Sequence, residues 1–239
     1  MANNLTLEDI NNLYFWATKL EEEGINFYSG EDIESKEDIL NLTGIVARNS
    51  LPKEVFKLNR LETLRILVDD LTELPKEIVN LNNLERLTIR CSNLKELPKE
   101  IGNLNNLKWL TIECPNLNEL PKEIGNLNNL EWLIIECPNL NELPKEIGNL
   151  NNLEKLEIKC HNLKELPKEI GNLNNLDGLI IKCHNLKELP KEIWNLSEFE
   201  VEFDIKNNNN KELLKYIVDS PNNENKDVEL KINIKKKED

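Results

Sequence analysis

The side chains best suited to chemistry in this sequence are five cysteines and two histidines, and the histidines directly follow the last two cysteines. Cys160, His161, Cys183 and His184 are residue types that hold zinc, which takes four thiolate and imidazole ligands in a tetrahedron. However, neighbouring residues of an extended chain point to opposite sides. The four side chains would therefore not converge easily on one ion, and we expect no metal site and no cofactor.

The spacing of the cysteines favours a structural role for them. Each follows the previous one by 23 residues, and Val68 takes the same place 23 residues before the first cysteine. A buried free cysteine packs as a small hydrophobe. We therefore predict that the thiols of successive cysteines stack inside the fold: Cys91, Cys114, Cys137, Cys160 and Cys183. Their odd number is consistent with a reduced, cytoplasmic protein.

Composition excludes several classes of function. The 239-residue chain has 30 Lys and Arg against 44 Asp and Glu, a formal net charge of −14, which argues against nucleic acid or an anionic membrane as partner. No apolar stretch approaches the roughly 20 residues that span a bilayer, and the first residues lack the pattern of a signal peptide. With two histidines, no glycine-rich phosphate loop and no Gly-x-Ser-x-Gly, we expect no enzyme and no small-molecule substrate.

The elements that must position these residues repeat along the chain. The tetrapeptide Leu-Pro-Lys-Glu begins at seven positions spaced by 23 residues: Leu51, Leu74, Leu97, Leu120, Leu143, Leu166 and Leu189. Within one unit, Leu84, Leu87 and Ile89 alternate as a short strand with one buried side. The return path around Pro98 has inward residues at Leu94, Leu97, Ile101 and Leu104. One unit cannot bury these leucines alone, so the units must stack around a shared core.

The unit LxxLxIxCxNLxELPKEIGNLNN closely resembles the leucine-rich repeat, in the 23-residue subclass whose convex half reads LPxxIxxLxxL. The resemblance implies an α/β fold, a right-handed solenoid or horseshoe with a parallel sheet on its concave side. One departure concerns the cysteine, which stands at place eight where the family has an inward Asn or Cys at place nine. We therefore expect the thiol to point inward and the turn after it to be altered.

Three segments are predicted: an N-terminal helical cap (1–39), the repeats (40–198) and a C-terminal cap (199–239). The apolar residues of 6–22 have helical spacing: Leu7, Ile10, Leu13, Tyr14, Ala17 and Leu20. Thr6 and Asp9 are placed as a capping box at the start of this helix. Beyond Phe199, alternating residues predict a strand, a helix over 210–219 and a second strand. The alternative for this last segment is a small module with its own partner.

The repeats can be compared with one another. Between residues 84 and 175 the convex half is almost constant, while the strand half differs at five places. We expect the constant Lys, Glu, Gly and Asn to be exposed, with one repeated glutamate forming a solvated ridge: Glu54, Glu77, Glu100, Glu123, Glu146, Glu169 and Glu192. Neutral drift would alter both solvent faces. We infer that the concave face has been diversified for one surface; copying of repeat blocks is the alternative.

The outward strand positions predict three columns on that face. The first contains Arg86, Trp109, Trp132, Lys155 and Gly178; the second Thr88, Thr111, Ile134, Glu157 and Ile180; the third Arg90, Glu113, Glu136, Lys159 and Lys182. Trp109 and Trp132 should lie one strand spacing apart, with Ile134 beside them. Exposed aromatic side chains in one patch are typical of protein-binding hot spots, and the charges around them would set partner choice.

We therefore predict a non-catalytic protein-binding module that contacts an unidentified protein partner through the concave face. The predicted contact residues are Arg86, Arg90, Trp109, Thr111, Glu113, Trp132, Ile134, Glu136, Lys155, Glu157, Lys159 and Lys182. Four alternatives remain at this stage. The two indoles could only stabilise neighbouring strands, the face could pair with a second copy of the chain, the chain could target an enzyme on a separate chain, or it could be a structural spacer.

Overall fold

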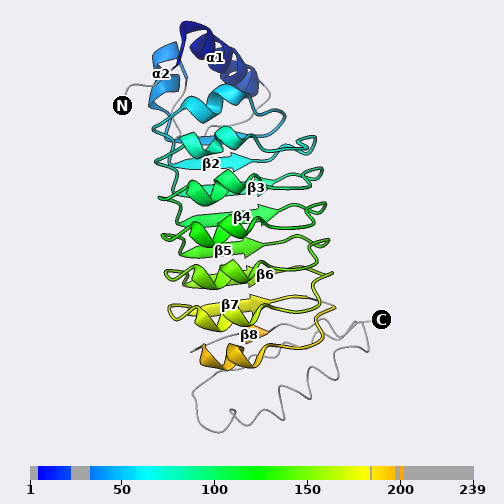
Figure 1. Cartoon of the computed structure of the whole chain (residues 1–239). Helices are drawn as coiled ribbons and strands as arrows, with labels where there is room; N and C mark the ends of the chain where they lie inside the picture. Colours follow the sequence, from blue (N-terminus) through cyan, green and yellow to red (C-terminus); the bar gives the residue numbers. More distant parts are fainter. Residues whose placement is uncertain (1–4, 23–32, 184, 197–199, 202–239) are drawn as a thin grey trace.

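The computed structural model describes residues 5–22, 33–183, 185–196 and 200–201, which form one stack of similar turns (Figure 1). Each turn contributes one strand to a parallel sheet whose strand order follows the chain. The strands are β1 (Gly44–Ala47), β2 (Thr63–Ile66), β3 (Arg86–Arg90), β4 (Trp109–Glu113), β5 (Trp132–Ile135), β6 (Lys155–Ile158), β7 (Gly178–Ile181) and β8 (Glu200–Val201). The predicted solenoid with a parallel sheet is confirmed, and the stack runs nearly straight, so the sheet is open and uncurled.

Opposite the sheet, each Leu-Pro-Lys-Glu segment leads into one short 3-10 turn. These turns are η1 (Lys53–Lys57), η2 (Lys76–Asn80), η3 (Lys99–Asn103), η4 (Lys122–Asn126), η5 (Lys145–Asn149), η6 (Lys168–Asn172) and η7 (Lys191–Asn195). In η3 the Ile101 amide donates to the Pro98 carbonyl, and the Leu104 amide donates to the Ile101 carbonyl. Pro98, in extended conformation at φ −66° and ψ 140°, suits the start of the turn because it has no amide hydrogen that needs a partner.

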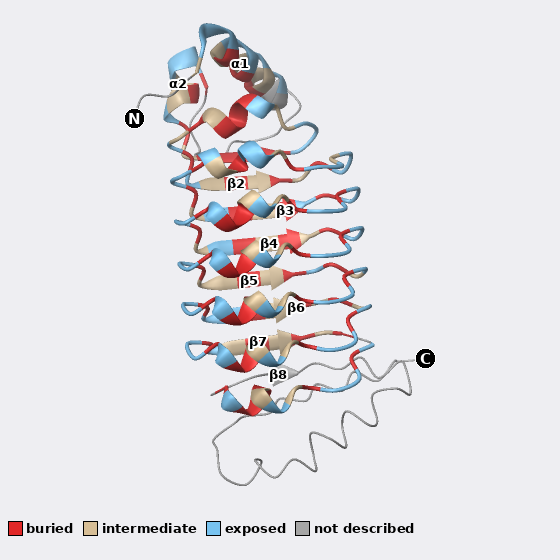
Figure 2. Cartoon of the chain, in the orientation of Figure 1, coloured by how far each residue is buried: buried red, intermediate tan, exposed pale blue. Residues whose placement is uncertain are grey.

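A continuous apolar core lies between the sheet and the 3-10 turns. Figure 2 shows that buried residues recur along each strand and each 3-10 turn. The residues predicted to point inward are all buried, among them Leu87, Ile89 and Ile101. The strand register keeps equivalent residues of successive turns side by side, as for Leu87 and Leu110. Each leucine therefore packs against its own copies, which is why a single unit could not fold alone.

The asparagines between each 3-10 turn and the next strand connect neighbouring turns. The side-chain amide of Asn106 donates to the carbonyl of Asn82 in the preceding turn at 2.6 Å. The same bond recurs from Asn129 to Asn105 at 2.7 Å and is repeated in other turns. The constancy of this asparagine thus has a structural cause, because each one satisfies a backbone carbonyl of its neighbour.

The glycines of the 3-10 turns are buried, which corrects the expectation that they are exposed. Gly102, Gly125, Gly148 and Gly171 each lie directly against the backbone of a glutamate in the following turn. A Cβ atom on Gly125 would overlap the carbonyl oxygen of Glu146. Glycine therefore lets successive 3-10 turns approach closely. We infer that this close approach contributes to the straightness of the stack, because wide elements on one wall would bend it.

Two helices cover the first turn of the stack: α1 (Leu7–Glu22) and α2 (Lys36–Asn41). The predicted capping box is confirmed, since the Thr6 amide donates to Asp9 Oδ2 at 2.7 Å and the Asp9 amide donates to Thr6 Oγ1 at 3.1 Å. Leu13 and Ala17 are buried, as expected from the spacing. Leu7 is 71% exposed, so its predicted place on the buried side of the helix is wrong.

The contact between α1 and the first 3-10 turn is polar. Lys57 Nζ lies 2.8 Å from Asp9 Oδ2. Hydrogen bonds from Lys57 and Thr6 lower the pKa of the Asp9 carboxyl to about 2. Glu54 is buried beside them and accepts a bond from the Asn12 amide at 3.5 Å. The expected ridge of solvated glutamates is thus wrong at its first member, because the helical cap covers that position.

At the other end of the stack, β8 pairs in parallel with β7, placing Ile181 beside Val201. This pairing agrees with the strand predicted after Phe199. The rest of the predicted strand, helix and strand cap, in residues 202–239, lies outside the described residues. Among the described residues, no helix is long and apolar enough to cross a membrane.

Candidate functional site: the open sheet face

The sheet side opposite the 3-10 turns, here called the open sheet face, carries all the residues predicted to contact a partner. It consists of the outward residues of β2 to β7 and the residues that directly follow β2, β5, β6 and β7. The twelve predicted contact residues are exposed or half-buried, and the strand register aligns them in the three expected columns. The strands therefore position these side chains as predicted, whereas their role in binding stays a prediction.

The first column is a continuous stack of aromatic and cationic groups. The Trp109 and Trp132 rings lie 4.7 Å apart between centroids with an angle of 9° between their planes. The Arg86 guanidinium lies 5.1 Å from the Trp109 ring centre, and the Lys155 ammonium lies 4.3 Å from the Trp132 ring centre. Both contacts fall within the range of cation–π interactions. We call these four residues the tryptophan stack.

The tryptophan stack exposes ring edges more than ring faces. Each indole has one face against the other indole and one face toward a cation. Trp109 is nevertheless 39% exposed, and Trp132 is half-buried. A ligand would therefore meet the indole edges, which form one apolar strip across β4 and β5.

In the third column, opposite charges pair across neighbouring strands. Arg90 Nε lies 3.1 Å from Glu113 Oε2. Lys159 Nζ lies 3.2 Å from Glu136 Oε2 and 3.1 Å from Glu157 Oε1 in the second column. Although partial burial opposes the charged form, hydrogen bonds to Glu157 and Glu136 raise the pKa of the Lys159 ammonium above its usual range. These pairs place the charged side chains next to one another beside the indoles.

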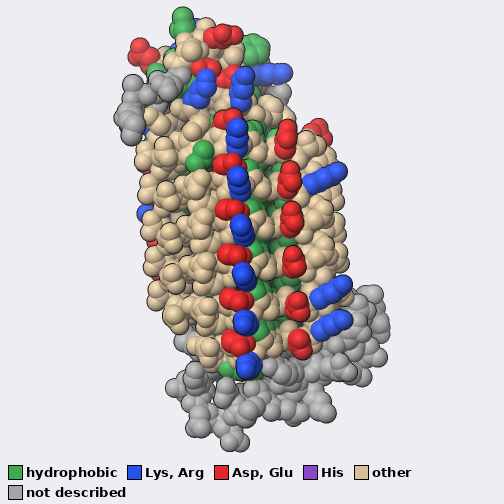
Figure 3. All heavy atoms as spheres, in the orientation of Figure 1, with side chains coloured by type: hydrophobic (Ala, Val, Ile, Leu, Met, Phe, Trp, Pro, Cys, Tyr) green, Lys and Arg blue, Asp and Glu red, His purple; other side chains and the backbone are tan. Residues whose placement is uncertain are grey.

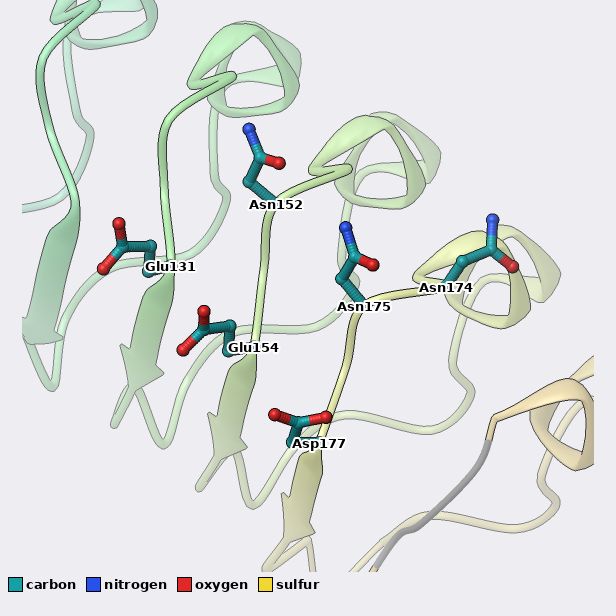
Figure 4. A pocket seen from close by; sticks show the side chains of 6 residues that line it. All are labelled: Glu131, Asn152, Glu154, Asn174, Asn175 and Asp177. Carbon is teal, nitrogen blue, oxygen red and sulfur yellow. The ribbon is translucent and has the colours of Figure 1, made fainter.

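Sequence reasoning missed a fourth column, at the edge where the chain enters each strand. Glu131, Glu154 and Asp177 occupy equivalent positions there and line a shallow polar depression (Figure 4). The depression is completed by the amides of Asn152, Asn174 and Asn175. At the equivalent place in β4's turn, Lys108 pairs with Glu85 at 3.2 Å. The second position of each LxxL segment could have revealed this column, because it also changes from repeat to repeat.

The wall opposite the open sheet face, here called the 3-10 wall, carries its charged side chains in regular columns (Figure 3). The Lys and Glu that open each 3-10 turn alternate in one column, and a second column of acidic side chains runs beside it. The exposed glutamates just before each Leu-Pro step occupy equivalent positions: Glu73, Glu96, Glu119, Glu142, Glu165 and Glu188. Among the described residues of this wall, the aromatic side chains Phe56 and Trp194 are buried and no exposed aromatic cluster is present, so the tryptophan stack distinguishes the open sheet face.

The cysteines are buried in the core, as predicted. The thiol of Cys114 lies 3.6 Å from the Ile89 carbonyl oxygen of the preceding turn, and its copies repeat this contact. Burial raises the pKa of the thiols of Cys114, Cys137, Cys160 and Cys183 to about 12. Such thiols stay protonated, which makes them poor nucleophiles and poor metal ligands.

The zinc alternative involves one residue beyond the described part of the chain, His184. Within the described residues, no three His, Cys, Asp or Glu side chains lie close enough together to hold a metal ion. Cys160 is fully buried whereas its neighbour His161 is half-buried. The two neighbouring side chains thus differ in environment, and His161 already belongs to the turn that follows the strand.

Comparison with known proteins agrees with this architecture. Residues 86–163 match the family model of a leucine-rich repeat region. A leucine-rich repeat protein of Leptospira interrogans is 29% identical, with a TM-score of 0.48; the match covers 69% of this chain and 55% of that protein. The leucine-rich repeat domain of the type III effector XopL is 22% identical, with a TM-score of 0.47, over 82% of this chain and 94% of that domain.

A chain of the Drosophila Toll–Spätzle complex is 19% identical, with a TM-score of 0.51, over 64% of this chain and 22% of that one. This chain therefore spans about half the length of the Leptospira protein and a smaller part of the Drosophila one. No curated protein matches the sequence significantly. Assignment to the 23-residue subclass stays a prediction. Residues 86–163 thus match leucine-rich repeats, and the same succession of strand and 3-10 turn extends from β1 to η7.

Proposed function

We propose that this protein is a non-catalytic binding module that holds a protein partner on the open sheet face, with Trp109 and Trp132 as apolar anchors. The observation that carries the proposal is the tryptophan stack, whose two aligned indoles lie on a solvent-facing sheet surface. Tryptophan and arginine are the residues most enriched in binding hot spots. The stack contains both types.

The open sheet face is suited to binding because its side chains are already ordered. The indoles are held between Arg86 and Lys155, and the third column is held by cross-strand ion pairs. A partner that docks on ordered side chains loses less conformational entropy than one that must fix them. The straight sheet also offers several anchors to a partner at once.

The simplest competing role for the tryptophan stack is stabilisation of neighbouring strands. A cross-strand aromatic pair contributes about 0.2–1 kcal/mol, so the stack has some value without any partner. The comparison of repeats is also less decisive than the sequence alone suggests, since the constant Gly and Asn have packing roles. Yet Lys99, Lys122 and Lys145 are exposed and constant too. The contrast between the two walls therefore still favours a binding role for the variable face.

The order of charges on the face argues against a symmetric dimer centred on the tryptophan stack. From β3 to β6, the first column reads cation, Trp, Trp, cation, and the third reads cation, acid, acid, cation. A two-fold axis along the strands would place Arg90 over Lys159 of the mate and Glu113 over Glu136. An axis along the solenoid would place Arg86 over Arg90. Both arrangements oppose like charges, so a different protein is the better partner.

Affinity capture from a lysate of the source cells tests this function. Wild type is compared with Trp109→Ala/Trp132→Ala and with a control, Leu7→Ala/Phe15→Ala, which removes the large exposed apolar side chains of α1. We expect a protein that is retained by wild type and the control but lost by the tryptophan variant. Equal retention by all three would place binding elsewhere on the chain. Light scattering of wild type, expected to give a monomer mass, checks the argument against the symmetric dimer.

The compartment stays part of the proposal. The described cysteines, one per turn from Cys91 to Cys183, are free thiols. Free thiols support the expectation of a reducing, cytoplasmic environment. Mass spectrometry of thiols trapped in intact source cells would test it, with oxidised cysteines as the contrary result.

A further inference from the structure

We propose that the partner segment on the open sheet face is an extended acidic peptide, with two carboxylates four residues apart and an apolar side chain midway between them. This inference rests on the function proposed above and specifies the chemistry of the partner. It follows from the charges, the spacing and the exposed atoms of the tryptophan stack.

The charges point to carboxylates in the partner. Around the indoles, Arg90 and Lys159 pair with glutamates, and so does Lys108 at the strand-entry edge. Within the described residues, Arg86 and Lys155 contact indole rings and pair with no carboxylate. A guanidinium or ammonium over a ring keeps donors free for a further hydrogen bond. The stack therefore ends on both sides in a cation that can still bind an acid.

The spacing points to an extended segment that crosses the strands. Arg86 lies on β3 and Lys155 on β6, with the indoles of β4 and β5 between them. Three strand spacings of about 4.8 Å place the two cations about 14 Å apart. An extended chain rises about 3.4 Å per residue, so side chains four positions apart share a face and are separated by the same length. The middle side chain, two positions along, then lies over the indole edges.

The overall acidity of the protein does not prevent this interaction. Arg90 neutralises Glu113, and Lys159 is shared between Glu136 and Glu157, so these two cations compensate most of the acidic charge nearest the indoles. Glu131 and Glu154, which form no ion pair within the described part of the chain, lie at the strand-entry edge. At physiological ionic strength, the charges of the opposite wall of the solenoid are largely screened, because the Debye length is about 8 Å. Direct pairing with Arg86 and Lys155 therefore has to outweigh only the nearby acids, among them Glu154, the sequence neighbour of Lys155. A basic segment on the acidic edge is the opposite outcome and is open to the same test.

Selection from a displayed library of random linear 12-residue peptides tests the proposal. Peptides are selected on the full-length protein and depleted on the Trp109→Ala/Trp132→Ala variant. We expect enrichment of Asp or Glu at two positions four apart, with an aromatic or aliphatic residue between them. Enrichment of Lys and Arg, enrichment without charge preference, or no enrichment over the depleted pool would each overturn the proposal.

Affinity measurements on the enriched peptide then locate the contact. We expect about tenfold weaker binding when its two carboxylates become amides and when the protein carries Arg86→Gln/Lys155→Gln, because each change removes both ion pairs. Lys122→Gln, a charge change on the opposite wall, should leave the dissociation constant unchanged. Equal affinity of wild type and the Arg86, Lys155 variant would overturn the inference. If retention of the lysate partner required the tryptophans but not Arg86 and Lys155, the proposed function would hold and only the inference would fail. If retention did not require the tryptophans, both would fail.

Discussion

The two walls of this solenoid are built from the same 23-residue unit, yet they differ in how much of the unit is fixed. On the 3-10 wall, Gly125 touches the backbone of Glu146, and in the bend that leads from this wall to the next strand Asn129 donates to the carbonyl of Asn105, so these residue types are dictated by neighbouring turns. On the open sheet face, outward residues such as Trp109 and Trp132 lie beside their counterparts on neighbouring strands. Packing therefore explains why residues opposite the sheet stay constant from repeat to repeat. The residues of the open sheet face are free to vary, and a binding surface can use this freedom.

The difference between the two walls would be contradicted most clearly if a glycine of the 3-10 wall could be replaced without loss of stability. Gly125→Ala should reduce the free energy of unfolding by about 1–3 kcal/mol, because a Cβ there overlaps Glu146 and forces neighbouring turns apart. The control is Gly178→Ala on the sheet, where the nearest atom to a new Cβ is a side-chain carbon of Lys155 at 3.8 Å. Urea denaturation should show a change within about 0.5 kcal/mol for the control. Equal losses in both variants would contradict the distinction between the walls.

The cysteine column between the walls should make stability fall at alkaline pH. Burial raises the pKa of the Cys137 thiol to about 12 from its ordinary value of 9.0. A raised pKa means that the folded state favours the protonated thiol. The stabilisation is therefore complete below pH 9 and is lost as pH rises from 9 toward 12. Urea denaturation at intervals across this range should show the decline.

A matched variant separates the thiols from other alkaline titrations. Cys137→Val introduces the residue that already occupies the equivalent place as Val68. It should lose less stability between pH 9 and 12 than wild type, because one titrating thiol is gone. In the native protein, a thiol reagent at neutral pH should react only as fast as the chain opens. Parallel pH profiles for the two proteins, or rapid labelling, would show that the thiols are not held in the core.

The repeat period was sufficient to predict much of the fold and the neighbourhood of Trp109 and Trp132. A 23-residue period fixes which residues become lateral neighbours, so the pairing of the two indoles followed directly from the alignment of repeats. The positions of Arg86 and Lys155 in the same column were predicted too. Their placement over the rings was not, because it depends on side-chain torsions that strand register does not determine.

The errors of prediction arose where distant parts of the chain meet. Burial of Gly102 depends on how closely the next turn approaches, and burial of Glu54 depends on a helix more than thirty residues earlier. The short helix α2 has a local signal that was not used, since Ser35 and Asp38 form a capping box at its start. The acidic edge at Glu154 was missed because it lies just before the strand, outside the alternating positions.

The asparagine bonds in the bends after the 3-10 turns offer a finer test of how packing fixes the constant residues. Asn129→Ala removes the donor to the Asn105 carbonyl and should cost about 1 kcal/mol of unfolding free energy. Asn141→Ala, at an exposed position that is Lys95 and Lys164 in other repeats, is the control and should be nearly neutral. Thermal and urea denaturation of the two variants would compare them directly. A neutral Asn129→Ala would mean that water replaces the bond and that packing does not explain the constancy of this residue.

The smallest expected change in stability concerns the two indoles of the tryptophan stack. The same variant gives the clearest test of whether the open sheet face serves binding or only stability. Trp109→Ala/Trp132→Ala should cost only about 0.2–1 kcal/mol, because stacking across neighbouring strands contributes little beyond the buried core. The same variant should abolish retention of the partner in affinity capture. Trp109→Phe/Trp132→Phe, which keeps aromatic faces for Arg86 and Lys155, should recover part of the binding. A loss of several kcal/mol with retention intact would instead make the stack a structural element of the sheet, and the variability of this face would then have no functional cause.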